Sequence, residues 1–226
     1  MIKMKNKFLS VLMILALSAS FAFAQEPSKI SFGIIGGANY QNLNGKLSSG
    51  DKLENDMLLG FHGGVNIQIP IAPEFYFQPG LMYAVKGAKS TYTFLSNDYT
   101  SKTKINYIEM PLNMVYKAAL GNGFFMLGFG PYVAYGIGGQ VVTEGGSVTL
   151  ENDIEFKSEA GILESPVYKP FDAGANIFVG YEMASGIFLQ LDTQFGMLNI
   201  NPERGTADDK SASKNTGFGL SLGYRF

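Results

Sequence analysis

The final segment of the chain alternates strictly between large apolar side chains and small or polar ones. It runs from Asn215 to Phe226 and reads NTGFGLSLGYRF. A period of two is that of a β-strand, because successive side chains of a strand point to opposite faces. One face here is bulky and apolar, and the other carries almost nothing except the charge of Arg225. This contrast is typical of a membrane β-barrel, which has lipid outside and a crowded polar lumen inside.

The beginning of the chain has the features of a secretory signal peptide. Three lysines precede an apolar run from Phe8 to Leu17, and small residues lead up to Ala24. The run is shorter than the ~20 apolar residues of a transmembrane helix. We therefore expect residues 1–24 to be removed and residues 25–226 to form one exported β-barrel domain. No cysteine is present to carry a lipid anchor.

Composition excludes several classes of function. The absence of cysteine rules out a disulfide framework and thiolate chemistry. A formal net charge of −2, without a basic run, leaves no electrostatic footprint for nucleic acid. We expect no nucleic-acid partner.

Seven further stretches alternate in the same way, which gives eight strands with the terminal one. They cover residues 30–40, 59–69, 75–86, 107–117, 125–136, 171–182 and 187–197. Short connections near 70–74, 118–123 and 183–186 alternate with long ones near 41–57, 87–103, 138–169 and 199–214. Short turns at one rim and long loops at the other predict an all-β protein, an eight-stranded antiparallel transmembrane β-barrel of the bacterial outer membrane.

Aromatic residues on the apolar faces gather at both ends of the predicted strands. The set near the short turns includes Phe75, Phe77, Tyr116, Phe125, Tyr181, Tyr224 and Phe226, and the set near the long loops includes Tyr40, Phe61, Tyr83, Tyr135 and Phe171. Such girdles mark the two membrane interfaces. The rival architecture is a soluble ligand-carrying barrel with its apolar face inside. We disfavour it because eight strands enclose too little volume for these rings.

Several segments resemble PorT-like outer-membrane barrel proteins. They are GFHGGVNIQIP from Gly60, FQPGLMYAVKGAK from Phe77, INYIEMPLNMVY from Ile105 and GFGPYVAY from Gly128. The resemblance spans the mature chain and implies an eight-stranded barrel assembled by the outer-membrane insertion machinery. That machinery would read a C-terminal aromatic such as Phe226. Most members of the family have no assigned activity, and a minority resemble an accessory of a protein-secretion apparatus.

Three prolines fall inside predicted strands, at Pro79, Pro111 and Pro131. Each removes one hydrogen-bond donor from the sheet, so we expect bulges or local breaks in strand pairing there.

Seven charged side chains lie on the predicted inward faces. They are Lys86, Glu109, Lys117, Asp172, Glu182, Asp192 and Arg225. The pattern places Lys117, Glu182 and Arg225 toward the short turns, Glu109 and Asp192 near mid-height, and Lys86 and Asp172 near the long loops. Because an unpaired charge is costly in a tightly filled lumen, we expect pairs across strands. These pairs would form either an internal plug that fixes the strand register or a gate on a narrow ion path.

His62 is the only histidine and is predicted on an inward face near the long loops. No serine or aspartate stands at a spacing that indicates a catalytic partner, so we expect no enzymatic activity. A single histidine without cysteine also argues against a tight metal site, and we expect no cofactor.

The third long loop is acidic, with Glu144, Glu151, Asp153, Glu155, Glu159 and Glu164 against Lys157 alone. It would either be simply solvated or bind calcium or a basic partner. Apolar residues at Val148 to Leu150 and at Ile154 to Phe156 indicate that strands continue beyond the membrane as a hairpin. The function expected is a structural or interaction role in the outer membrane, in its specific form an accessory to protein secretion. The alternative is a narrow channel for small or hydrophobic solutes.

Overall fold

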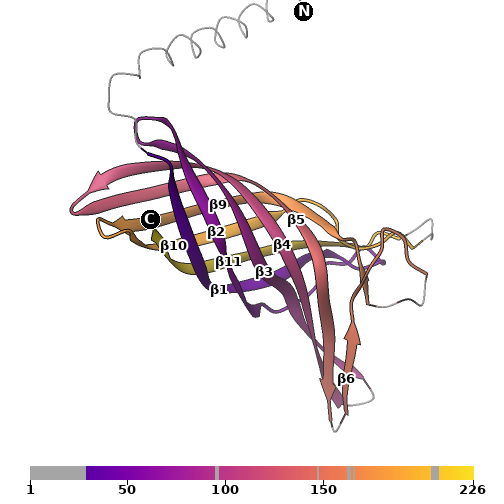
Figure 1. Ribbon diagram of the computed structural model, residues 1–226. Helices are drawn as coiled ribbons and strands as arrows, with labels where there is room; N and C mark the ends of the chain where they lie inside the picture. The colour runs from indigo at the N-terminus through magenta and orange to yellow at the C-terminus, as the bar shows by residue number, and fades with distance from the viewer. Residues whose placement is uncertain (1–28, 95–96, 147, 162–163, 165, 205–208) are drawn as a thin grey trace, which may run out of the picture.

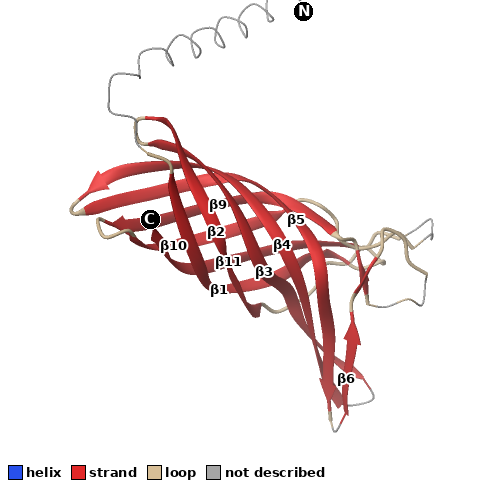
Figure 2. Ribbon diagram, in the orientation of Figure 1, coloured by secondary structure: helices blue, strands red, loops and turns tan. Residues whose placement is uncertain are grey.

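The computed structural model describes residues 29–94, 97–146, 148–161, 164, 166–204 and 209–226. The expected signal peptide, residues 1–24, lies outside these ranges. Every regular element within them is a β-strand (Figure 2). None of the described residues forms a helix long and apolar enough to cross a membrane.

Eight strands close into an antiparallel barrel (Figure 1). They are β1 (Ser31–Lys46), β2 (Leu58–Ala72), β3 (Phe75–Phe94), β4 (Asn97–Leu120), β5 (Gly123–Gly145), β9 (Phe171–Met183), β10 (Ile187–Gly196) and β11 (Ala212–Arg225). Each strand pairs with the next in this order, and pairing between β11 and β1 completes the ring. The predicted fold class and all eight predicted strands are confirmed.

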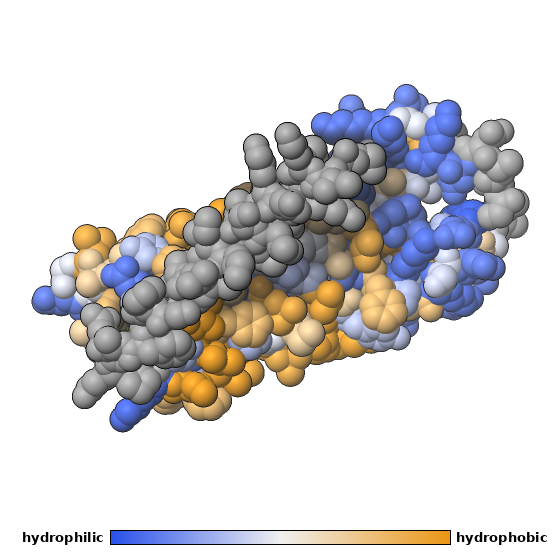
Figure 3. Space-filling model, turned by 90° about the horizontal axis from the view of Figure 1, so that it is seen from above, coloured by the Kyte–Doolittle hydropathy of each residue, from blue (hydrophilic) through white to orange (hydrophobic). Residues whose placement is uncertain are grey.

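The apolar faces point outward, as the alternation predicts. Phe32, Phe61, Leu81, Phe129 and Leu222 are each more than half exposed although they are strongly apolar. The space-filling view shows such residues along the barrel wall, with hydrophilic residues gathered at the end that carries the loops (Figure 3). An exposed apolar wall of this kind needs lipid around it.

Outward aromatic residues pair across neighbouring strands at both ends of the wall. Near the long loops, Tyr40 stacks on Phe218 with ring centroids 5.7 Å apart. Near the short turns, the Phe75 and Tyr116 rings lie 5.1 Å apart. These pairs occupy the two levels predicted for the girdles, where amphipathic rings suit the membrane interface.

The interior contains apolar layers as well as polar groups. Near the short turns, Val115, Met126, Phe178 and Phe188 form a buried cluster. Near the long loops, a second cluster contains Leu43, Ala88, Ile105, Tyr107, Tyr132, Ala134, Ile154 and Ile200. The described lumen is therefore filled by side chains in layers, as expected for the narrow bore of eight strands.

Strand pairing is interrupted beside each of the three prolines. The β3–β4 register passes from Pro79↔Leu112 to Met82↔Glu109 without pairs between them. The β4–β5 register skips in the same way around Pro131, and the β2–β3 register skips beside Pro79. The expected breaks are confirmed, and they run across three neighbouring seams of the barrel.

Three strands continue far beyond the barrel, which corrects the long loop predicted at residues 87–103. Strands β3 and β4 pair without interruption from Val85↔Asn106 to Phe94↔Asn97. Strand β5 follows them to Gly145 and then pairs with β6 (Val148–Asp153). We call this four-stranded sheet the extension; it comprises residues 89–94, 97–104, 140–145 and 148–153, and Figure 1 shows it projecting from the loop end. A hairpin beyond the membrane was predicted from residues 148–156. In the structure, β6 pairs with the end of β5 to form this hairpin. The residues that follow form β7 (Glu155–Phe156), which pairs in parallel with β8 (Val167–Tyr168).

The extension bends away from the barrel at a bulge between Asn106 and Tyr107, where the register with β5 shifts. Gly87 and Gly139 adopt positive φ angles of 146° and 158° at the same level. A β-carbon on Gly87 would collide with the carbonyl oxygen of Thr103. Glycine and a bulge together allow three paired strands to turn at one height.

Candidate functional site

Three of the predicted inward charges form a cluster near the short turns, which we call the short-turn cluster. Lys117 Nζ lies 2.7 Å from Glu182 Oε1, and Arg225 Nε donates to Glu182 Oε2 at 2.9 Å. All three residues are at least nine-tenths buried. The carboxylate of Glu182 on β9 thus bridges Lys117 on β4 and Arg225 on β11.

Neutral side chains complete the hydrogen bonding of the short-turn cluster. Arg225 Nη1 donates to Asn66 Oδ1 at 2.9 Å, and its Nη2 lies 3.4 Å from Gln78 Oε1. Gln68 donates to the same oxygen of Gln78 at 2.7 Å. The guanidinium also lies 5.2 Å from the centroid of the Phe188 ring. Side chains from six strands (β2, β3, β4, β9, β10 and β11) therefore meet at this end of the lumen and fill it.

A second cluster lies nearer the long loops, and we call it the long-loop cluster. Lys86 Nζ lies 2.6 Å from Glu109 Oε2 and 3.4 Å from Asp172 Oδ2. Tyr132 donates to Asp172 Oδ2 at 3.1 Å, and Asn215 donates to the same oxygen at 3.0 Å. The ammonium group of Lys86 also stands 4.1 Å from the Tyr132 ring centroid. The lysine is entirely enclosed by two carboxylates and an aromatic face.

The positions of these residues agree with the inward faces read from the sequence. Glu109 was expected near mid-height beside Asp192, and both line the same stretch of the lumen; its carboxylate also pairs with Lys86 and so belongs to the long-loop cluster. Asp192 stays apart from both clusters, and no lysine or arginine of the described residues lies within ion-pair distance of it. Phe226 lies at the short-turn end, 71% exposed, with its backbone N–H donating to Phe32 O.

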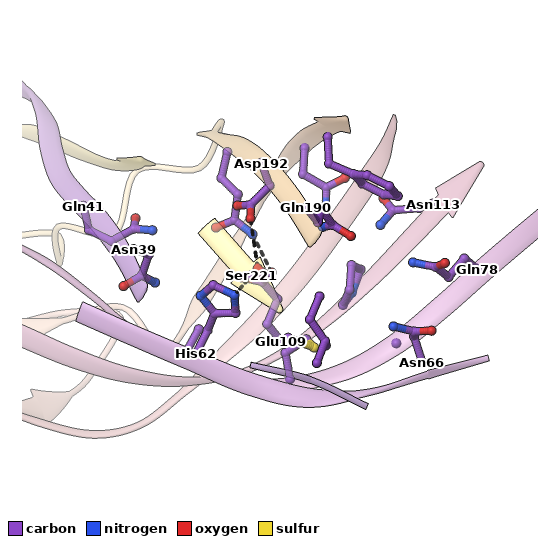
Figure 4. A pocket seen from close by; sticks show the side chains of 18 residues that line it. Asn39, Gln41, His62, Asn66, Gln78, Glu109, Asn113, Gln190, Asp192 and Ser221 are labelled. Carbon is purple, nitrogen blue, oxygen red and sulfur yellow. Dashed lines mark hydrogen bonds between the residues drawn. The ribbon is translucent and has the colours of Figure 1, made fainter. Parts of the chain in front are cut away.

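A cavity of about 70 Å³ lies in the lumen between the two clusters. Eight of its lining residues carry amide side chains, and His62, Glu109, Asp192 and Ser221 also line it, together with apolar residues such as Met82 and Phe178 (Figure 4). His62 Nε2 lies 2.7 Å from Ser221 Oγ, and Ser221 Oγ donates to Asp192 Oδ1 at 3.5 Å. The cavity is large enough for a few water molecules and is rich in their hydrogen-bond partners.

Sequence reasoning did not find the partners of His62, because residues 62, 192 and 221 lie on β2, β10 and β11. Their inward orientation follows from the period of two, but their common height depends on how the barrel closes. The arrangement differs from a catalytic triad. In a triad the imidazole stands between the serine and the carboxylate, whereas here the serine stands between them.

The described residues contain no group of three or more potential metal-ligating His, Cys, Asp or Glu side chains. What the interior offers is charge pairing and hydrogen bonding. Two ion clusters and two apolar layers occupy the lumen on either side of a small polar cavity.

Comparison with known proteins agrees with this architecture. The family model described as "Outer membrane protein beta-barrel domain" matches residues 23–201. The chain belongs to this family. The protein is therefore located in the bacterial outer membrane, and its exposed apolar wall contacts lipid.

Solved outer-membrane barrels resemble this chain at low sequence identity. Ail from Yersinia pestis is 9% identical, with a TM-score of 0.40, and the match covers 88% of this chain and all of that one. Neisserial surface protein A is 11% identical, with a TM-score of 0.41 and coverage of 88% and 100%. OprG from Pseudomonas aeruginosa is 13% identical, with a TM-score of 0.44 and coverage of 87% and 95%. No curated protein sequence matches the chain.

Proposed function

We propose that this barrel is a non-enzymatic interaction protein that presents the extension to a protein partner outside the membrane. The observation that carries the proposal is the contrast between its two parts. The barrel interior is filled by ion clusters and apolar layers, whereas the extension has a free edge and exposed aromatic and aliphatic side chains. The long loops, and with them the extension, face the outside of the cell.

The surface of the extension fits a partner that adds a β-strand. Among the residues that the structure describes, strand β6 pairs with β5 alone, so its other edge leaves backbone N–H and C=O groups without a strand partner there. Such an edge is a template for strand addition. Lys102 and Glu144, 2.8 Å apart on the same sheet, keep this region out of the lipid.

One face of the extension is suited to cover such a partner. The Tyr92 and Tyr99 rings stack with centroids 5.7 Å apart, and Tyr99 lies over Gly145, where a β-carbon would meet its ring. Leu150 lies two residues from Val148, which pairs with Gly145, so Leu150 shares this face and is 57% exposed. Aromatic side chains beside a free strand edge are typical of peptide-binding sheets.

The resemblance to PorT-like proteins gives the proposal its specific form, an accessory of protein secretion. The segments that carry it, such as GFGPYVAY from Gly128, lie in the barrel wall rather than in the extension. The partner is then a component of a secretion apparatus. The insertion machinery acts earlier, and Phe226, which is 71% exposed at the short-turn end, is accessible to it.

Site-specific photo-cross-linking in intact cells tests the interaction surface. A photoreactive residue at Leu150 should capture a protein partner, because this side chain lies on the proposed docking face beside the free edge. The matched control is Thr149, which is exposed on the opposite face of the same strand. Equal capture at both positions, or none at Leu150, would contradict the proposal.

The channel alternative has one observation in its favour, the polar cavity at mid-lumen. Its lining would suit water or a small solute. Conduction would require both ion clusters to move, because each lies between the cavity and one end of the lumen.

A further inference from the structure

Two carboxylates of the acidic third loop lie on β6, the outermost strand of the extension (Figure 1). They belong to Glu151 and Asp153, and both side chains are exposed. Within the described ranges, neither has a lysine or arginine at ion-pair distance, whereas Glu144, Glu155 and Glu164 each pair with a lysine. The strand therefore carries negative charge that its own sheet does not compensate.

The backbone of the same two residues faces the free edge of β6. Ile154 N donates to Gly139 O on β5 at 3.0 Å, and the β5–β6 register runs back from there without a shift. In an antiparallel pair only every second residue bonds to the neighbouring strand. Glu151 and Asp153, which are three positions and one position before Ile154, accordingly turn their N–H and C=O groups away from β5.

The chain itself adds a strand to the continuation of this edge. Glu155 N donates to Pro166 O at 3.1 Å, and Lys157 N donates to Tyr168 O at 3.0 Å, which pairs β7 with β8. Glu155 is two residues beyond Asp153, so its backbone faces the same side. The side of the chain that β8 covers at β7 is thus open along β6.

We propose that the β6 edge accepts an extended segment of the partner in which lysine or arginine alternates with apolar residues. This inference rests on the interaction role proposed above and adds the chemistry of the partner. Side chains that stand opposite Glu151 and Asp153 share their face of the sheet, where cations form ion pairs across the strands. The residues between them turn to the face of Leu150 and the Tyr99 ring, where apolar side chains and the rest of the partner pack.

A second copy of β6 lacks this chemistry. If two β6 strands paired antiparallel about a two-fold axis, the carboxylates of both copies would gather on one face, and like charges on facing strands are destabilising. Lysines of the same sheet do not offset this charge. Lys104 is in register with Asp153 through Gln140, but it lies on β4, two strands and roughly 10 Å away.

Peptide binding to the full barrel in phosphatidylcholine nanodiscs tests the proposal. The probe is a short fluorescent peptide in which lysine alternates with valine, and its control has glutamine in place of lysine. Fluorescence anisotropy at low salt, after subtraction of the signal from empty nanodiscs, should show that the lysine peptide binds about 2- to 30-fold more tightly, because two ion pairs across strands are added.

Two variants separate the charge from the edge. Glu151→Gln with Asp153→Asn keeps the strand and should make the two peptides bind alike. Thr149→Pro keeps both carboxylates and the pairing with β5 but removes one N–H from the free edge, so it should weaken the binding of both peptides. Glu159→Gln removes an exposed carboxylate outside β6 and should leave the preference for lysine unchanged.

The outcomes distinguish this inference from the interaction role on which it rests. Equal binding of the two peptides by the wild type would overturn the inference, although strand addition would stand if Thr149→Pro weakened both. A preference that survives Glu151→Gln with Asp153→Asn would also overturn it. If neither peptide binds, the inference fails and the cross-linking at Leu150 decides whether an interaction role remains. Dimers that Thr149→Pro dissolves would identify a second copy as the occupant of the edge instead.

Discussion

Arg225 and Glu182 are joined by a 2.9 Å hydrogen bond across the lumen, from the penultimate residue of the chain to the carboxylate on β9. The same carboxylate binds Lys117 at 2.7 Å. The last strand of the barrel is therefore locked to its neighbours from inside as well as through its backbone. Arg225 Nη1 also donates to Asn66 Oδ1 on β2, and this contact crosses the β11–β1 seam, so we expect it to form only when the ring is closed.

Glu182→Gln should destabilise the barrel strongly. The change leaves Lys117 and Arg225 without a carboxylate in a buried site, and the loss of one partner from a buried ion network costs roughly 3–5 kcal/mol. The measurement is the temperature at which the folded band is lost in a heat-modifiability gel. Glu144→Gln, which removes the exposed pair with Lys102, is the control and should change stability by less than about 1 kcal/mol. Similar melting of the two variants would argue against a structural role for the short-turn cluster.

Lys86→Met should be more harmful than the pair of changes Lys86→Met and Glu109→Gln together. The single change leaves two carboxylates facing each other around a site with no cation, whereas the double change removes one of them. A double-mutant cycle on unfolding free energies should give a coupling of about 0.5–3 kcal/mol. If the two changes in unfolding free energy simply added, the pair of Lys86 with Glu109 would contribute nothing to the stability of the barrel.

Gly87→Ala should loosen the extension while the barrel stays closed. Residue 87 has a positive φ of 146°, and a β-carbon there would collide with Thr103 O, so strain on the order of 1–3 kcal/mol is expected. Amide hydrogen exchange should accelerate in residues 89–94 and 97–104. Gly63→Ala is the control, because a β-carbon at that position meets its nearest atom at 3.6 Å. Unchanged protection in Gly87→Ala would mean that the bend does not depend on the glycine.

Glu164 should titrate below the ordinary range for a glutamate. Its pKa is lowered by the hydrogen bond from the backbone N–H of Gly161 and then by Lys157, which lies 3.1 Å away. Because the folded pKa is depressed, its contribution to loop order is present above the unfolded pKa and is lost as pH falls through the folded pKa. Carboxyl NMR in lipid nanodiscs measures this shift directly.

Lys157→Met should bring the pKa of Glu164 closer to normal but not remove the shift, since the Gly161 contact remains. A Glu164 that titrates normally in the wild-type protein would contradict the loop arrangement. Arg204, whose Nη1 donates to Gly161 O and Glu164 O at 2.8 Å each, holds the same segment from the other side.

The barrel could be predicted from the sequence because lipid imposes a period of two on every strand. Phe218, Leu220 and Leu222 face lipid, while the residues between them face the lumen. The amino-acid sequence alone shows this contrast, because large apolar residues alternate with small or polar ones. The β3–β4 part of the extension was missed because water contacts both of its faces. Residues 87–103 carry Lys, Ser and Thr in both orientations, so no contrast in polarity reveals the strand.

The inward charges could be predicted, but most of their partners could not. Lys86 and Asp172 are far apart in sequence, and the stagger of the closed sheet determines which side chains share a height. Phe178 and Phe188 show a second limit. Each sits between apolar neighbours, so the alternation did not reveal that these rings face inward to fill the bore.

Single-channel conductance in a planar lipid bilayer tests whether the side chains of the lumen close the barrel to ions. Wild-type protein should be silent, because ion clusters and apolar layers fill the lumen on both sides of the cavity. A Lys117→Ala, Arg225→Ala double variant should also be silent, since the long-loop cluster and its apolar layer remain. Steady conductance from the wild type, rising in the double variant, would contradict this account and identify the short-turn cluster as the gate of a channel.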